Sequence, residues 1–223
     1  MPAEDGGKVA QMSAVQVAPS HYDWSTYNVK GRWASYRHQI DEVLRSRARN
    51  CLEVGTGSGI VRDTLRRFGV DATVVDIDET LGADRVGDVR ALPAEPAEFD
   101  VVLCSQVLEH LPWQDVPKAV GELHRVCRTG AIVSLPQSGR DLTIELAIPK
   151  LVRHRRVHAR VNSPKPWRFD GQHYWQVLAR GTGRRAVRRI LAGPGFRIER
   201  EYTVPELTYH RFYVLTRARP RQS

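Results

Sequence analysis

The stretch LEVGTGSGI, residues 52–60, decides the fold of this chain. The short run CLEV ends at Val54 and has the composition of a buried strand. Glycines at positions 55, 57 and 59 then form a turn, and the run IVRDTLRRFG has helical spacing up to the closing Gly69. The run ATVVDID, residues 72–78, follows as a second buried strand. Strand, glycine turn, helix and strand within about thirty residues predict a βαβ unit.

The same alternation continues towards the C-terminus. Buried strands are predicted over residues 99–105 and 130–136, with a helix over 114–128 between them. A further helix over 183–193 precedes two alternating runs that are typical of antiparallel strands, residues 196–204 and 208–217. This order predicts an α/β fold whose doubly wound, Rossmann-like sheet is mostly parallel and ends in an antiparallel C-terminal strand pair.

The length of the chain, 223 residues with 41% apolar side chains, suits one sizeable core, so we expect a single domain over residues 1–223. The run GRWASYRHQIDEVL has apolar residues at helical spacing and predicts an N-terminal helical lid. After Pro136 the regular pattern ends, and we expect an irregular loop region of about forty-five residues, inserted after the fifth strand. The expected parts are the lid (1–46), the core (47–136), the insertion (137–182) and a C-terminal helix with closing strands (183–223).

The composition excludes membrane-spanning and disulfide-framed classes. No apolar run approaches the length of about eighteen residues that crosses a bilayer, and the N-terminus has no signal pattern, so we expect a cytoplasmic protein. Cys51, Cys104 and Cys127 are odd in number and widely spaced, which favours reduced buried thiols. The polar residues 1–20 are expected to be disordered or loosely attached. The sequence is compatible with a homo-oligomer and leaves the oligomeric state open.

The basic charge of the chain is concentrated in one segment. The net charge is +9, and residues 150–200 contain 14 Lys or Arg against only Asp170 and Glu199, so the rest of the chain contains 20 basic and 23 acidic residues. The blocks RHRRVHAR and RRAVRR would attract a polyanion, a phosphorylated substrate or a partner protein. The alternative is a solvated basic face without a partner.

The glycine turn indicates the type of ligand. A nicotinamide fingerprint needs a glycine at position 60, where Ile60 stands. A glycine turn that opens a helix still suits a nucleotide-like ligand, because the ligand can approach the backbone and the exposed amides. The acidic residue followed by G-x-G-x-G resembles the first motif of the class I S-adenosylmethionine (SAM) dependent methyltransferases.

Three further motifs agree with this resemblance, which covers residues 47–136: ATVVDID, GDVRALP and FDVVLCSQVLEHLP. The resemblance implies SAM as the cofactor, with contacts in the following places. The methionine part would lie at Glu53 and Gly55, the ribose at Asp76, the adenine amino group at Asp88 and the sulfonium at Ser105, Gln106 and Val107, with Thr56, Gly57, Ile77 and Val89 as further contacts. The reaction would then be an in-line displacement in which the protein mainly positions a nucleophile.

The segment QVLEH, residues 106–110, resembles the metal site of small-RNA 3′-terminal 2′-O-methyltransferases and, more loosely, quinone-biosynthesis O-methyltransferases. The resemblance implies that Glu109, His110 and a downstream His173 in GQHYW bind Mg²⁺. Gln106 stands where those RNA enzymes have a first glutamate, and its neutral amide would weaken the metal site. Two alternatives remain: His173 or Asp170 acts as a base without metal, or the segment only packs.

Eight aromatic residues would form two walls over the cofactor mouth: Tyr22, Trp24, Tyr27, Trp33, Trp167, Phe169, Tyr174 and Trp175. Flat apolar faces beside polar groups suit a sugar ring, although they suit a nucleobase almost as well, or simply pack. We therefore predict an O-methyltransferase acting on a hydroxyl of a sugar or oligosaccharide, similar to enzymes of methylated-polysaccharide biosynthesis. The alternatives are an RNA ribose methyltransferase, another natural-product methyltransferase, and a non-catalytic SAM-binding partner subunit.

Overall fold

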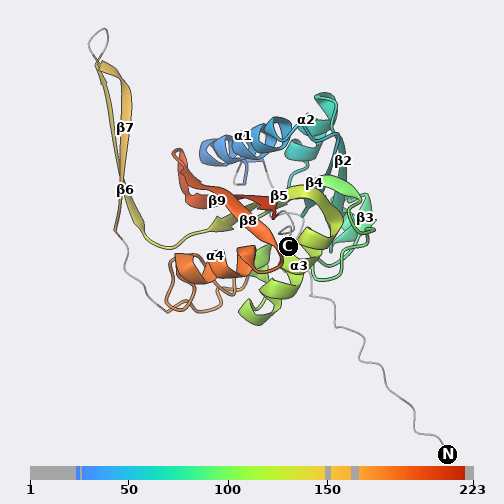
Figure 1. The fold of residues 1–223 in the computed structure, drawn as a ribbon. Helices are drawn as coiled ribbons and strands as arrows, with labels where there is room; N and C mark the ends of the chain where they lie inside the picture. The colour runs from blue at the N-terminus through green and yellow to red at the C-terminus, as the bar shows by residue number, and fades with distance from the viewer. Residues whose placement is uncertain (1–23, 26, 149–151, 162–165, 219–223) are drawn as a thin grey trace, which may run out of the picture.

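The computed structural model describes residues 24–25, 27–148, 152–161 and 166–218. The N-terminal residues 1–20 and Tyr22, on which two of the expectations above fall, lie outside this part of the chain. Figure 1 shows a central sheet covered by helices on both faces. No helix in the described part combines the length and the apolar character that crossing a membrane requires.

The central sheet has seven strands in the order β3-β2-β1-β4-β5-β9-β8. The strands are β1 (Asn50–Val54), β2 (Asp71–Asp76), β3 (Arg85–Val86), β4 (Phe99–Ser105), β5 (Cys127–Pro136), β8 (Phe196–Val204) and β9 (Leu207–Arg217). The first five are parallel to their neighbours, whereas β9 pairs antiparallel with both β5 and β8. The prediction of a mostly parallel α/β sheet with an antiparallel C-terminal pair is confirmed.

Helices cover both faces of the sheet, as the alternation of strands and helices requires. They are α1 (Lys30–Arg45), α2 (Ile60–Arg67), α3 (Val116–Val126) and α4 (Arg184–Ala192), with short 3₁₀ turns η2 (Glu79–Leu81), η3 (Leu108–His110) and η4 (Trp113–Asp115). In Figure 1, α1 and α2 lie on one face and α3 and α4 on the other. Each face has its own apolar core: Val43 and Leu65 belong to the first, and Leu123 and Leu191 to the second.

The insertion differs from the predicted irregular loop. Strands β6 (Arg140–Ile148) and β7 (Val152–Val161) form an antiparallel hairpin, a separate two-stranded sheet that extends away from the body in Figure 1. The run DLTIELAI alternates apolar and polar residues with the period of a strand, a signal that we overlooked beside the arginine-rich block. That block, RHRRVHAR, is part of β7.

Helix α1 is attached to the far edge of the sheet by a buried carboxylate. Glu42 accepts hydrogen bonds from both terminal nitrogens of Arg200 and from the hydroxyl of Tyr202, at 2.7 Å. Since Glu42 is only 5% exposed, losing these partners would leave a buried charge without compensation. The bond network therefore determines which face of α1 turns towards the carboxyl edge of the sheet.

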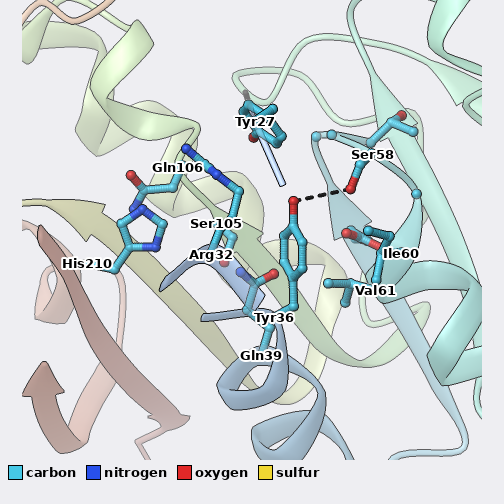
Figure 2. A pocket seen from close by; sticks show the side chains of 15 residues that line it. Tyr27, Arg32, Tyr36, Gln39, Ser58, Ile60, Val61, Ser105, Gln106 and His210 are labelled. Atoms are coloured by element: carbon cyan, nitrogen blue, oxygen red, sulfur yellow. Dashed lines mark hydrogen bonds between the residues drawn. The ribbon is translucent and has the colours of Figure 1, made fainter. Parts of the chain in front are cut away.

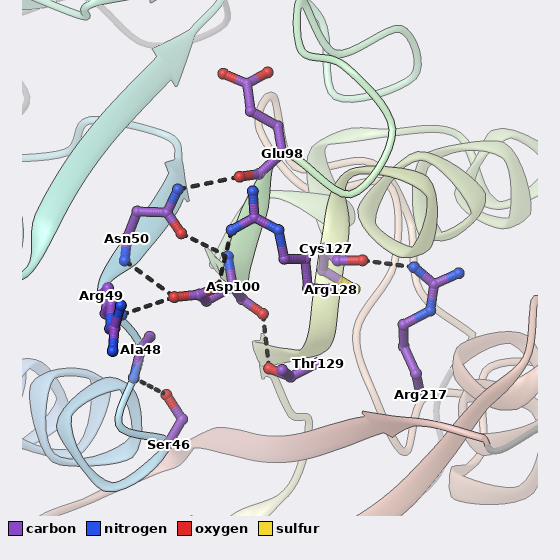
Figure 3. A network of polar contacts seen from close by, with 10 residues as sticks. All are labelled: Ser46, Ala48, Arg49, Asn50, Glu98, Asp100, Cys127, Arg128, Thr129 and Arg217. Atoms are coloured by element: carbon purple, nitrogen blue, oxygen red, sulfur yellow. Dashed lines mark hydrogen bonds and ion pairs between the residues drawn. The ribbon is translucent and has the colours of Figure 1, made fainter.

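A second network joins three strands at the opposite, amino edge (Figure 3). Asp100 accepts hydrogen bonds from the Arg49 amide at 2.8 Å and from Arg128 at 3.0 Å, and its own amide donates to the Asn50 side chain at 2.8 Å. Thr129 donates to the Asp100 carbonyl at 2.7 Å. The hydrogen bond from the backbone amide of Arg49 is the main cause that lowers the pKa of Asp100, against the opposing effect of burial. The starts of β1, β4 and β5 are thus held in register.

All three cysteines are free and buried, which confirms the expectation of reduced thiols. Burial raises the pKa of Cys127 to about 11, and that of Cys51 and Cys104 further still. Because the thiolate is the reactive form, these residues act as small apolar side chains in the core.

Candidate active site

A pocket opens at the carboxyl edge of the sheet between β1 and β4, where the strand order reverses. Doubly wound folds bind their ligands at this point. Figure 2 shows side chains from α1, from the glycine turn, from the end of β4 and from β9 around the pocket. The lining residues are Tyr27, Arg32, Tyr36, Gln39, Glu53, Gly55, Thr56, Gly57, Ser58, Gly59, Ile60, Val61, Ser105, Gln106 and His210.

The turn between β1 and α2 requires glycine at its first position. Gly55 has φ +88°, and a Cβ atom there would lie 2.8 Å from the Val107 side chain. The turn is attached to the end of β2, because the Thr56 amide donates a hydrogen bond to the Asp76 carboxylate at 2.7 Å. On the side of α1, the Tyr36 hydroxyl lies 3.1 Å from the Ser58 hydroxyl, and the two form a hydrogen bond (Figure 2). Helix α1 therefore covers the glycine turn directly.

One acidic and one basic side chain line this pocket, and each has an atom without a hydrogen-bond partner among the described residues. Glu53 is 6% exposed, and its Oε2 atom has no hydrogen-bond partner among the described residues. Burial raises the pKa of Glu53 to about 8, against the opposing effect of Arg62. The buried Nε of Arg32 also has no partner in this part of the chain, and the guanidinium stacks on Tyr27 at 3.8 Å. Buried polar atoms of this kind are costly unless a ligand satisfies them.

Sequence reasoning singled out Glu53 but missed Arg32. The helical spacing of α1 indicated which of its residues are apolar, but not which polar residue would point at the cofactor side. The only local signal is the run of polar and aromatic residues around Arg32, which is typical of many amphipathic helices.

Asp76 lies at the end of β2 and stabilises the glycine turn through hydrogen bonds. Its two carboxylate oxygens accept hydrogen bonds from the amides of Thr56 at 2.7 Å and Asp78 at 3.0 Å. A carboxylate offers about four acceptor positions, so two remain for a ligand. Ile77 follows directly and is half-buried.

Asp88 and Val89, the expected adenine contacts, are already engaged within the protein. Asp88 forms a short ion pair with Arg90 at 2.6 Å, and Arg90 also contacts Asp115 at 2.8 Å. The side chain of Val89 is 7% exposed and packs in the core beneath α3.

At the end of β4, Ser105 and Gln106 line the pocket. Gln106 has φ +56°, a conformation that few residues other than glycine adopt. Its amide donates to the Ser134 carbonyl at 2.9 Å and its side-chain amide to the Ser134 hydroxyl at 3.2 Å. The Ser134 hydroxyl in turn donates to Ser105 at 3.0 Å. A strained residue that is held by two hydrogen bonds is typical of a functional position.

Next to this position, the structure brings together Glu109, His110 and His173. One possible ligand atom from each lies within 4.8 Å of the others, and the two imidazole rings are 5.0 Å apart. Glu109 and His173 are separated by 64 positions, so only the folded chain unites them.

Packing of the segment 172–175 onto η3 holds the cluster together. The Tyr174 amide donates to the Glu109 carbonyl at 2.8 Å, and Nδ1 of His110 donates to the Gln172 carbonyl at 3.0 Å. Trp175 is 2% exposed and packs edge-on against Trp113, with ring centroids 4.7 Å apart.

The cluster consists of one buried and two half-buried residues and is poor in compensating charge. Glu109 is fully buried, neither of its carboxylate oxygens has a hydrogen-bond partner among the described residues, and burial raises its pKa to about 8. Burial and then the neighbouring His173 lower the pKa of His110 to about 4, while burial lowers the pKa of His173. Asp170 accepts from the Gln172 and His173 amides at 2.9 and 2.7 Å, and its other oxygen lies 3.5 Å from Nδ1 of His173. That last separation is an electrostatic contact and too long for a good hydrogen bond.

Of the aromatic residues expected at the mouth, four are exposed and lie in two pairs. The rings of Trp24 and Trp33 are 6.0 Å apart, and those of Phe169 and Tyr174 are 4.5 Å apart. Trp175, by contrast, belongs to the core.

A methyltransferase domain is recognised over residues 52–135, which include β1, the glycine turn, β2, β4 and the Glu109–His110 segment. Together with the sheet order, this match shows that the chain contains a SAM-dependent methyltransferase domain with the class I fold.

The chain is 30% identical over 144 residues to a ubiquinone biosynthesis O-methyltransferase from Psychrobacter arcticus, covering 56% of this chain and 55% of that protein. The chain thus spans about half the length of the curated relatives it matches. Two solved structures share the fold. The magnesium protoporphyrin IX methyltransferase of Synechocystis PCC 6803 has a TM-score of 0.57 at 17% identity, covering 84% of each chain. The Burkholderia thailandensis 1,6-didemethyltoxoflavin-N1-methyltransferase has a TM-score of 0.57 at 17% identity, covering 94% of each chain.

Proposed function

We propose that this protein is a SAM-dependent O-methyltransferase that methylates a hydroxyl of a polar small molecule, a sugar or oligosaccharide. The observation that carries the cofactor assignment is the pair of unsatisfied atoms beside the glycine turn, Oε2 of Glu53 and Nε of Arg32. The methionine part of SAM has one ammonium and one carboxylate, so its charges match these two groups. The name of the curated relatives, ubiquinone biosynthesis O-methyltransferase, supports oxygen as the methylated atom.

In this arrangement the remaining acceptor positions of Asp76, with Ile77 alongside, receive the ribose. The segment Asp88–Val89 contacts adenine mainly through its backbone, because the Asp88 carboxylate is paired with Arg90. The sulfonium lies at Ser105 and Gln106. Within the lid expected over residues 1–46, helix α1 supplies side chains that lie over the pocket.

The pH dependence of binding S-adenosylhomocysteine (SAH) tests the role of Glu53. Because burial raises the pKa of Glu53 to about 8, its carboxyl is mostly protonated at neutral pH in the free protein. The ligand ammonium favours the ionised form, so binding releases a proton below pH 8 and the affinity falls as the pH falls. We expect the dissociation constant to rise roughly tenfold for each unit below pH 8. Calorimetric titration at several pH values measures this. Glu53→Gln is expected to remove this pH dependence. If the affinity of the wild type for SAH did not change between pH 6 and 8, the proposed role of Glu53 would be wrong.

The partly buried cluster of Glu109, His110 and His173 fits a divalent cation. Both oxygens of Glu109 and Nδ1 of His173 are buried without hydrogen-bond partners in the described part of the chain, as expected of atoms that ligate a metal. Two imidazoles and one carboxylate favour Mn²⁺, Co²⁺ or Zn²⁺ over Mg²⁺, which prefers oxygen ligands. When bound, such a cation lowers the pKa of an acceptor hydroxyl. In its absence, His173 with Asp170 is the candidate base.

Metal binding is tested without any acceptor. Titration of Mn²⁺ into the purified, chelator-treated protein is expected to give one bound ion per chain. His173→Ala is expected to weaken this binding roughly tenfold or more, since it removes one of three protein ligands. His124→Ala, which changes a histidine on α3 away from the cluster, serves as the control. Binding that is equally strong in His173→Ala would remove this histidine from the metal site.

The acceptor class rests on the two exposed aromatic pairs, Trp24 with Trp33 and Phe169 with Tyr174. Their flat faces suit the apolar C–H face of a sugar. The proposal as a whole is tested by transfer of a labelled methyl group from SAM to methyl glycosides, oligosaccharides, catechols and short RNA, with added Mn²⁺ or a chelator. Labelled glycoside supports the proposal, whereas failure to label any acceptor would indicate a non-catalytic SAM-binding subunit.

An RNA ribose is the second candidate acceptor, favoured by the basic composition of β7 and α4. Part of this charge has a structural role, because Arg184 and Arg188 contact the buried Glu201 at 2.9 and 2.6 Å. RNA binding would weaken steeply as the salt concentration rises. Absence of binding to short RNA at low salt would reject this candidate.

A further inference from the structure

A buried histidine of β9 lines the cofactor pocket, although no motif pointed to it. His210 is 2% exposed and lies in the wall of the pocket beside the glycine turn. It pairs with Pro136 in the ladder between β9 and β5, which places it where β5 ends at the carboxyl edge of the sheet. Phe212, two residues further along β9, packs in the core on the α1 face, and alternate residues of a strand share a face. The His210 side chain therefore points towards α1.

The face of α1 that meets this histidine also carries Arg32. Nδ1 of His210 lies 2.8 Å from the Ser35 hydroxyl oxygen, and the Gln39 side-chain amide lies 3.4 Å from the same oxygen. Arg32, Ser35 and Gln39 are spaced i, i+3 and i+7 along the helix, so they lie on one of its faces. Figure 2 shows Arg32, Gln39 and His210 around the pocket. The imidazole ring and the guanidinium group thus belong to the same side of the pocket.

One nitrogen of the ring is engaged and the other is free. Ser35 and Gln39 are 0% and 4% exposed, so the partners of Nδ1 are sealed within the protein. Nε2 has no hydrogen-bond partner among the described residues, and, unlike Nε of Arg32, it is not closed off from the pocket. A serine hydroxyl donates or accepts equally well, so the contact with Ser35 determines the orientation of the ring and leaves its tautomer to the ligand. Nε2 can therefore present a proton to an anionic group.

The charge of the surroundings indicates which group that is. Burial, and then the positive charge of Arg32, lower the pKa of His210 to about 3, so the ring is neutral near neutral pH. A neutral ring supplies a donor without placing another positive charge near the sulfonium of the cofactor. The neighbouring guanidinium favours a negatively charged ligand group. Both properties match the carboxylate of the methionine part, which is the only negatively charged group of SAM.

We propose that His210 is a cofactor-binding residue whose Nε2–H donates a hydrogen bond to the carboxylate of the methionine part of SAM, beside Arg32. In this state the Ser35 hydroxyl donates to Nδ1, so Ser35 is a positioning residue that acts through the ring. The inference rests on the proposed binding of SAM in this pocket and adds a second donor to its carboxylate subsite.

Two substitutions of His210 separate its two nitrogens. The amide nitrogen of asparagine reaches about as far as Nδ1, whereas that of glutamine reaches about as far as Nε2. We expect the SAH dissociation constant to rise roughly tenfold in His210→Asn, the size typical of a lost hydrogen bond to a charged group. In His210→Gln it should stay within about threefold of the wild type, because a donor remains near the carboxylate. Calorimetric titration measures both. A histidine that only packs would give equal losses in the two variants.

The matched control is His38→Asn. The His38 ring packs against Tyr202 and Phe212 and does not line the pocket, so the SAH affinity of this variant should equal that of the wild type.

A ligand without the carboxylate tests which group His210 contacts. Decarboxylated SAH keeps the adenosine, the thioether and the ammonium, so the wild type and His210→Asn should bind it within about twofold of each other. Ser35→Ala, which suits a helix, should raise the SAH dissociation constant about threefold and leave the affinity for the decarboxylated ligand unchanged. Equal weakening for both ligands would show that His210 shapes the pocket, which overturns the assignment.

The outcomes distinguish this inference from the function it rests on. If the wild type binds SAH and His210→Asn binds it as tightly, the role of His210 is wrong and the SAM assignment stands. If only KM for the methyl acceptor rises, the ring serves the acceptor, which also overturns the inference. A wild type that does not bind SAH would reject the proposed function itself. Thermal unfolding shows whether His210→Asn is folded, and for an unfolded variant the comparison of Ser35→Ala on the two ligands decides.

Discussion

Glu109→Gln is expected to reduce methyl transfer roughly a hundredfold or more, the size typical of losing a group that handles the transferred proton. Glu109 is fully buried, and its carboxylate has no hydrogen-bond partner among the described residues. The amide of glutamine has nearly the same shape but carries no charge, so it weakens a cation site and cannot accept a proton. The rate of transfer from labelled SAM at saturating acceptor measures the effect.

Thermal unfolding supplies a readout that does not depend on activity. A buried carboxylate without partners destabilises the fold, so the metal-free Glu109→Gln protein should unfold at the same temperature as the wild type or higher. Glu95→Gln, an exposed glutamate before β4, is the control and should change neither property. Full activity in Glu109→Gln would exclude both the metal site and a catalytic part for this carboxyl group.

Arg32→Gln is expected to weaken SAH binding roughly thirtyfold or more, which corresponds to about 2 kcal/mol for a charged hydrogen bond in a partly buried pocket. The reason is that Nε of Arg32 is buried without a hydrogen-bond partner in the described part of the chain, so it can donate to the ligand carboxylate. The guanidinium is already stacked on Tyr27 at 3.8 Å, so little side-chain entropy is lost on binding. Calorimetric titration with SAH measures the change.

The matched control is Arg37→Gln, one helical turn and a half along α1. Arg37 is 74% exposed in its side chain and pairs with Asp41 on the surface, so its loss should leave SAH affinity unchanged. Adenosine lacks the homocysteine part of SAH and therefore its carboxylate, so it should bind the wild type and Arg32→Gln equally. A thirtyfold difference for adenosine too would show that Arg32 supports the pocket and does not contact the carboxylate.

Local patterns were enough to predict much of the fold. The strand before Gly55 and the strand after the next helix are short apolar runs, and glycine at position 55 follows from its positive φ and from the 2.8 Å approach to Val107. The hairpin of residues 140–161 also has a local signal, in the alternation of residues 141–148, but the prediction failed because charge was given more weight than periodicity.

The sequence by itself determined the class of the protein, since the order of strands, the glycine turn and the carboxylates that follow depend on neighbouring residues along the chain. Only the tertiary structure decided which distant groups share a site. His173 reaches Glu109 because Trp175 packs in the core, and Arg32 faces the pocket because Glu42 attaches α1 to β8. These distances depend on how whole elements dock, and docking is governed by buried area and paired polar groups that no spacing along the chain records.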